Sequence, residues 1–171
     1  MTELWNWRVD GDVDPAEIYQ ALADVLGRPV LALGAYRPIR PIGGTVLCDV
    51  WRRPGDFPVS VDCYGPPGLP EGSAVAAFAH RLGRSCLLPD DTLDGGRYLL
   101  VDPDGTMRPV HFDVRDTDEG EVLSGRRLCT RVSPRCRGWS PCHQSRWPPV
   151  PWQLRKVRTG RTAQIWAEMV T

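Results

Sequence analysis

Three of the six cysteines and one of the three histidines lie close together in the last third of the sequence. Cys129, Cys136 and Cys142 are followed directly by His143. Three thiolates and an imidazole have the composition of a structural zinc site. The spacing argues against one, because the paired C-x2–4-C arrangement of such sites is absent. Incidental or redox-sensitive thiols are the alternative.

A second arrangement would pair a nucleophilic thiol, Cys48 or Cys63, with His111. His111 and Asp113 alternate along an expected strand, so they should share a face and could form a base with its orienting carboxylate. No feature of the spacing brings a cysteine to them, and cysteines in apolar strands usually behave as small buried hydrophobes. We therefore expect no catalytic residues, and keep a Cys/His-dependent hydrolase as an alternative only.

Other catalytic and cofactor motifs are missing. The sequence has no GxxxxGK phosphate loop, no GxGxxG, no HExxH and no GxSxG. Residues 10–14 have the carboxylate spacing of a calcium loop, but Pro15 and Ala21 stand where such a loop needs Gly and Glu. No cofactor is expected.

The sequence predicts two helices and several strands, which would hold any functional side chains in place. Asp14 and Pro15 predict a helix start, apolar residues follow at helical spacing, and Gly27 predicts its end. A second helix is expected over residues 73–82. Apolar or alternating segments around it, at 4–9, 30–33, 45–51, 59–64 and 86–88, predict strands. A hairpin over 98–114 is expected to turn at Asp104 and Gly105.

This pattern predicts an α+β fold with two helices on one face of a mainly antiparallel or mixed sheet. Residues 21–31 and 77–87 are identical at six of eleven aligned positions. The repeat suggests two β-α-β-β halves, although one helix-to-strand turn could also have arisen twice by chance.

The net charge of zero is the sum of two opposite segments. Residues 1–120 contain 11 Arg and 19 Asp and Glu, a net charge of −8, and residues 121–171 have +8. We therefore expect an acidic α+β domain over 1–119 and a basic, partly irregular tail over 120–171, rich in Arg, Pro, Trp and Cys. A tail produced partly by a frame change is an alternative that its composition leaves open.

With 171 residues, 42% of them hydrophobic, the chain can bury a core of its own. It has no apolar stretch of membrane-spanning length and no basic-then-apolar secretion signal, so no membrane partner and a bacterial cytoplasmic location are expected.

The main functional hypothesis is a non-enzymatic module, resembling an immunity protein or antitoxin only by analogy, whose acidic surface binds another protein. Its candidate contacts are six carboxylates expected to be exposed: Asp90, Asp91, Asp94, Asp116, Asp118 and Glu119.

The alternative partner is nucleic acid, bound through phosphate contacts and base stacking by the tail. Its candidate residues are Arg135, Arg137, Trp139, Arg146, Trp147, Arg155, Lys156 and Arg158.

Overall fold

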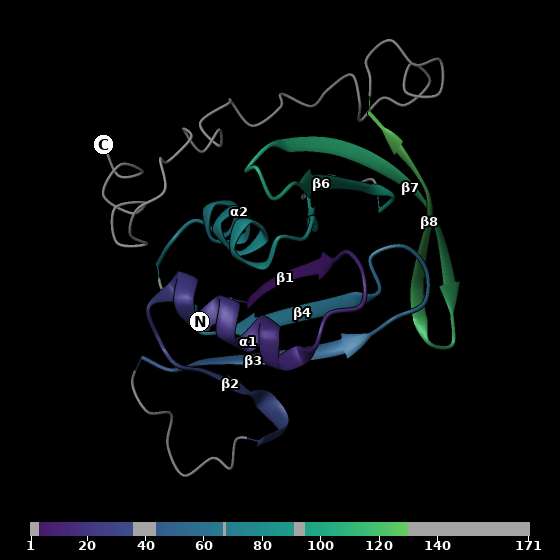
Figure 1. Ribbon diagram of the computed structural model, residues 1–171. Helices are drawn as coiled ribbons and strands as arrows, with labels where there is room; N and C mark the ends of the chain where they lie inside the picture. The colour runs from purple at the N-terminus through teal and green to yellow at the C-terminus, as the bar shows by residue number, and fades with distance from the viewer. Residues whose placement is uncertain (1–3, 36–43, 67, 91–94, 130–171) are drawn as a thin grey trace.

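A computed structural model describes residues 4–35, 44–66, 68–90 and 95–129 (Figure 1). They form one eight-stranded mixed sheet with two helices, in the strand order β2-β3-β4-β1-β5-β6-β7-β8. The strands are β1 (Leu4–Val9), β2 (Val30–Ala32), β3 (Val46–Arg52), β4 (Val59–Tyr64), β5 (Cys86–Pro89), β6 (Arg97–Val101), β7 (Met107–Thr117) and β8 (Gly120–Leu128). Within this sheet β2 and β3 are parallel and the other neighbours are antiparallel. The predicted α+β fold is confirmed.

Helix α1 (Pro15–Leu26) begins and ends at the predicted residues. The Asp14 side chain accepts a hydrogen bond from the Ala16 amide at 2.8 Å, which satisfies one of the free amides of the first turn. Gly27 ends the helix in the left-handed conformation, with φ of 61°. The local sequence alone is therefore enough to explain this helix.

Helix α2 (Glu71–Leu82) starts two residues earlier than predicted and also ends at a left-handed glycine, Gly83. The first residue of α2 connects the helix to β1, since a Glu71 carboxylate oxygen accepts a hydrogen bond from the backbone amide of Asn6 at 3.0 Å. The earlier start follows Pro70, whose extended backbone at the N-cap suits a helix boundary.

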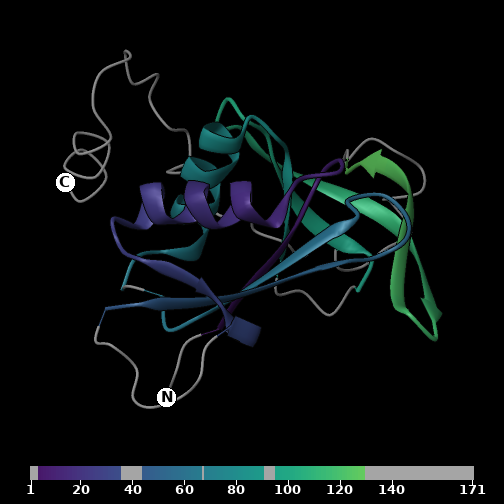
Figure 2. The same cartoon turned by 60° about the horizontal axis from the view of Figure 1, so that its bottom comes forward.

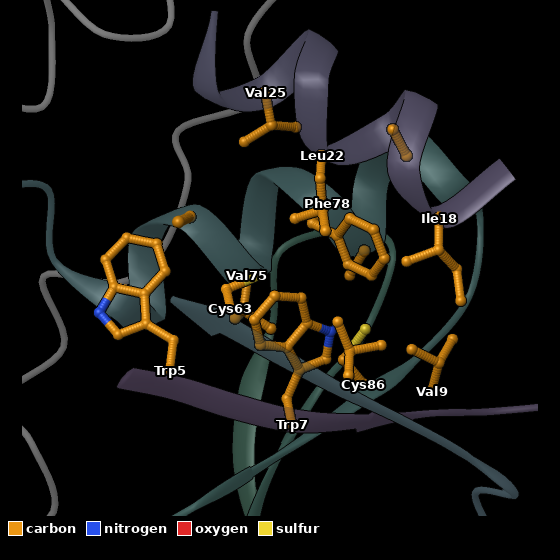
Figure 3. Packing of buried hydrophobic residues seen from close by; sticks show 14 of the residues in the cluster. Trp5, Trp7, Val9, Ile18, Leu22, Val25, Cys63, Val75, Phe78 and Cys86 are labelled. Carbon is orange, nitrogen blue, oxygen red and sulfur yellow. The ribbon is translucent and has the colours of Figure 1, made fainter. Parts of the chain in front are cut away.

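Both helices pack on the same face of the sheet, where they cover an apolar core (Figures 1 and 2). Because side chains alternate along a strand, β1 turns Trp5, Trp7 and Val9 toward the helices, as Figure 3 shows. The rings of Trp7 and Phe78 meet edge to face, with centroids 5.4 Å apart. The side chains of this core are almost all apolar.

The far end of the sheet curls over its other face. Strand β8 stands four places from β1 in the strand order, yet the Arg8 guanidinium of β1 reaches the Glu121 carbonyl and carboxylate of β8 at 3.3 Å. The Asp56 amide of the β3–β4 connection also donates to the Leu123 carbonyl at 2.8 Å. Beneath this overlap lies a second, smaller core, made of Phe57, Leu87, Leu100, Val110, Phe112 and Leu123.

The first part of the expected tail belongs to the sheet. Strand β8 pairs along β7 from Gly120 to Leu128, and Leu123 is fully buried in the second core. The sheet therefore continues beyond residue 119. The division of the chain into two domains stays a prediction, because residues 130–171 lie outside the described part.

The internal repeat corresponds to two helix-to-strand turns. The element order contains β-α-β-β twice, as β1-α1-β2-β3 and β4-α2-β5-β6, followed by the β7–β8 hairpin. The strand pairing differs between the two, since β2 and β3 are parallel whereas β5 and β6 are antiparallel. The halves are alike in element order and unlike in pairing.

Among the described residues, neither helix is long and apolar enough to cross a lipid bilayer.

Candidate functional site

The acidic residues proposed from the sequence as partner contacts are not in one place. Asp116, Asp118 and Glu119 are exposed at the end of the β7–β8 hairpin, which projects from the body in Figure 1. Asp91 and Asp94 lie outside the described residues. The hairpin end therefore keeps three of the six proposed contacts.

Asp90 is not the exposed carboxylate that the sequence suggested. Its side chain is only 5% exposed and forms an ion pair with Arg97, itself 2% exposed, with 2.9 Å between Oδ2 and Nε. Asp90 follows β5 and Arg97 opens β6, so the pair closes the connection between these strands. Burial of Asp90 removes it from any surface that a partner protein could contact.

The residues considered for a Cys/His site point into the protein. Cys48 and Cys63 are fully buried on the helix-covered face, with their sulfur atoms 3.8 Å apart. The hydrogen bond with Cys63 raises the pKa of Cys48, and burial raises it further, which disfavours the nucleophilic thiolate. His111 lies on β7, and β1, β5 and β6 separate that strand from β4 in the sheet.

His111 and Asp113 keep the alternation expected along β7, but they differ in burial and in partners. A β-bulge between them shifts the register of β7 against β8. His111 is buried, whereas Asp113 is exposed and forms an ion pair with Arg127 at 2.7 Å. The Asp113 carboxylate is therefore engaged by Arg127, and the alternative of a Cys/His-dependent hydrolase gains no support from this pair.

The two tail hypotheses fall almost entirely on residues that the structure does not describe. All eight nucleic-acid candidates lie beyond residue 129, as do Cys136, Cys142 and His143 of the metal set. Cys129 is half-buried, and its amide donates to the Pro109 carbonyl at 3.0 Å. Within the described residues no group of three His, Cys, Asp or Glu could hold a metal ion.

The most distinctive feature of the described structure is a cavity of about 500 Å³ on the face of the sheet away from the helices, here called the helix-free face. A volume of this size is typical of small-molecule sites. Polar, charged and aromatic side chains dominate its lining, the main ones being Asn6, Arg8, Trp51, Arg53, Ser60, Asp62, Asp90, Arg97, Tyr98 and Glu121.

Strand register explains the floor of this cavity. Alternation turns Asn6 and Arg8 away from the helices, opposite to Trp7. Pairing across β1, β4 and β3 then aligns Arg8 with Ser60 and Trp51 in one row. The next row aligns Asn6 with Asp62 and Asp49.

Two of the three lining arginines are neutralised by carboxylates. Arg97 is held by Asp90, and Arg8 is held by Glu121 of the overlapping strand. Burial lowers the pKa of Arg8, Arg53 lowers it further, and Tyr98 and Glu121 raise it. The Glu121 carboxylate therefore compensates the charge that Arg8 carries in a half-enclosed place.

Arg53 and Asp62 are the two charged lining groups without such a partner. Within the described residues no carboxylate or carbonyl accepts a hydrogen bond from the Arg53 side chain, and its Nε is shut off from solvent. Its guanidinium lies 5.6 Å from the ring centroid of Trp51. Burial raises the pKa of Asp62, as does Asp49, whereas Arg53 lowers it.

Sequence reasoning missed this site, although part of its signal was visible. The alternation of Trp5, Asn6, Trp7 and Arg8 already indicates that one face of β1 is polar. The contribution of Glu121 depends on the curl of the sheet, which no local pattern indicates.

Comparison with known proteins adds no identification. No protein-family model, no curated protein and no solved structure matches the chain at a significant level.

Proposed function

We propose that the protein is a binding module that holds a small polar molecule in the cavity on its helix-free face. The observation that carries the proposal is the combination of enclosure and charge. A cavity of about 500 Å³ contains two arginines held by carboxylates, and beside them a third arginine and a carboxylate that no described side chain pairs by a hydrogen bond.

Ion pairs of this kind favour binding because they fix charges in advance. Glu121 holds Arg8 and Asp90 holds Arg97 in fixed positions. A ligand would therefore bind without the entropic cost of ordering these two side chains. Trp51 and Tyr98 supply the aromatic surface that commonly lines small-molecule sites. Arg53 and Asp62 then remain to recognise polar groups of the ligand.

The test is amide NMR of the full chain against a set of small polar molecules. At least one compound should shift the amides of cavity residues such as Arg8, Ser60 and Asp62. Arg53→Gln should lower the affinity for that compound about tenfold, which corresponds to the loss of one charged hydrogen bond. Arg115→Gln, which removes an exposed arginine of β7 outside the cavity, serves as the matched control.

Two results would count against the cavity. One is a set of compounds that leaves all lining residues unperturbed. The other is equal loss of affinity in the Arg53 and Arg115 variants, which would mean a general effect of surface charge.

A second candidate function is the binding of a basic partner protein by the end of the β7–β8 hairpin, as the sequence suggested. The observation that favours it is the exposure of Asp116, Asp118 and Glu119 together, with no ion pair to another described residue. Such a cluster would steer a cationic surface, and the attraction would weaken with salt.

The hairpin hypothesis is tested with the triple variant Asp116→Asn, Asp118→Asn and Glu119→Gln. A basic protein that copurifies with the wild-type chain at low salt should be lost from this variant. It should be retained by the control Asp10→Asn with Glu17→Gln, which neutralises exposed carboxylates elsewhere. Retention by both variants would refute the hairpin as the contact.

The bacterial cytoplasmic location and nucleic-acid binding by the tail stay predictions from the sequence.

A further inference from the structure

The pairing pattern in the cavity restricts the kind of ligand. Its lining holds three arginines (Arg8, Arg53, Arg97) and three carboxylates (Asp62, Asp90, Glu121). Equal numbers of opposite charges give no net attraction for a polyanion such as a nucleoside triphosphate. A ligand that matches this lining should itself carry both signs of charge, or neither.

Arg53 offers the anion-binding half of the cavity. A guanidinium has five donors, and a carboxylate can accept two of them side by side. Arg53 has a buried Nε without a hydrogen-bond partner, and Arg8 lies near enough to interact with it electrostatically. Because Nε is closed to solvent, a carboxylate in the cavity would accept hydrogen bonds from the terminal N–H groups of Arg53, and it would reduce the repulsion between the two arginines.

Asp62 offers the cation-binding half. It stands directly opposite Asp49 across β3 and β4, and two carboxylates in that position repel one another. Burial and Asp49 raise the pKa of Asp62, so its negative charge is incompletely compensated. On its other side Asp62 is paired in register with Asn6, whose side-chain carbonyl can accept a further hydrogen bond.

We infer that the cavity binds a zwitterion of the α-amino acid type, with its carboxylate at Arg53, its ammonium group at Asp62 and Asn6, and an apolar or aromatic side chain against Trp51 and Tyr98. This inference rests on the proposed binding function and names its ligand class. The Arg53 and Asp62 charges attract one another across the cavity, and the zwitterion replaces that attraction with two direct ion pairs.

Three matched probes test this inference on the full chain: L-phenylalanine, N-acetyl-L-phenylalanine and L-phenylalaninamide. They keep one side chain but present a zwitterion, an anion and a cation respectively. Titration calorimetry should find the zwitterion bound at least about tenfold more tightly than either analogue, because each analogue loses one charged hydrogen-bonding group.

Variants assign the two ends of the probe. In Arg53→Gln, phenylalanine should bind no better than phenylalaninamide, because the partner of the carboxylate is gone. In Asp62→Asn, phenylalanine should bind no better than its N-acetyl form. Arg115→Gln and Asp10→Asn, both at exposed positions outside the cavity, should leave all three affinities unchanged.

The outcomes separate the inference from the function on which it rests. If the acetylated or the amidated probe binds as tightly as phenylalanine, the zwitterion is wrong and the cavity remains a ligand site. The same holds if none of the three binds while another small polar molecule shifts the cavity residues. If no small molecule of any class shifts them, the inference and the proposed function both fall.

Discussion

The two faces of the sheet bury their side chains by different physical means. On the helix-covered face, Trp7 and Val9 of β1 pack against apolar side chains of α1 and α2 (Figure 3). On the helix-free face the same strand presents Asn6 and Arg8, and the chain encloses them by curling β8 over the sheet. One face is sealed by apolar packing, and the other by a smaller apolar core together with paired charges.

The difference shows where binding can occur at low energetic cost. A packed apolar core gains nothing from further contacts, since its groups already touch one another. Charged groups that are partly buried lose favourable interactions with water. The ion pairs of the protein replace these interactions only in part. Arg53 and Asp62, which have no ion-pair partner among the described residues, are therefore the groups that can still form ion pairs with a ligand.

The largest effect is expected from opening the apolar core with Phe78→Ala. Phe78 is fully buried against Trp7, so the variant should lose about 3–5 kcal/mol of unfolding free energy in urea denaturation. Leu31→Ala, at a side chain that is 43% exposed, is the control and should change stability by less than about 0.5 kcal/mol. Comparable losses in both would mean that the helix-covered face is not the main core.

The next effect tests whether charge pairing holds the helix-free face. Asp90→Ala leaves Arg97 buried without its carboxylate and should cost about 3 kcal/mol. The double variant Asp90→Leu with Arg97→Met removes both charges and should recover most of that loss. If the double variant unfolds as easily as the single one in the same urea titration, the charge of Arg97 is not what destabilises the single variant.

A smaller effect should follow from loosening the overlap of β8 with the β3–β4 connection. Gly55 has φ of 93°, and a Cβ there would lie 2.5 Å from the Leu123 carbonyl oxygen. Gly55→Ala should therefore cost about 2 kcal/mol and shift the amides around the cavity.

Gly44→Ala separates crowding from backbone strain. Gly44 has the same φ of 93°, but within the described part of the chain no atom beyond its immediate neighbours in sequence lies within 4 Å of its added Cβ. It should lose less stability than Gly55→Ala and leave the cavity amides unchanged. Equal losses would show that the approach of β8 to Gly55 does not matter.

The smallest effect concerns the charge of Asp62. Its pKa is raised in the folded protein, chiefly by burial, so its ionisation opposes folding. Asp62→Asn should therefore be slightly more stable than the wild type at neutral pH, by less than about 1 kcal/mol because solvent screens the site.

The gain from Asp62→Asn should depend on pH in one direction. It is fully present above the raised folded pKa and disappears as the pH falls below the ordinary pKa of an aspartate. Urea unfolding across that pH range measures it, with Asp10→Asn as the control for loss of one exposed carboxylate. A gain that grows toward acid would have the wrong sign.

Much of the secondary structure followed from local residues. Asp14, Pro15 and Gly27 marked both ends of α1 because caps act within one turn of the helix. Asp104 and Gly105 marked the β6–β7 turn, where the Asp104 side chain accepts a hydrogen bond from the Thr106 amide. The extension of β7 and the strand β8 were not predicted, since charged and polar residues there hide the apolar positions Val122 and Leu123.

The candidate site was beyond local reasoning. Arg8 and Glu121 are 113 residues apart in the sequence, and they meet only because the sheet curls. Asp90 read as a surface carboxylate because nothing near it in the sequence identifies Arg97 as its buried partner. The missed contact of Arg8 with Glu121 and the wrong exposure of Asp90 have the same cause. Whether a charged side chain is buried depends on a partner that only the folded chain brings to it.

By itself, the sequence determined the two helices, most of the strands and the turn between β6 and β7, since caps, turns and side-chain periodicity act over a few residues. The tertiary structure decided which polar residues became a cavity. It did so because curling a sheet requires contacts between distant strands, and only these contacts determine which charges are paired and which are left for a ligand.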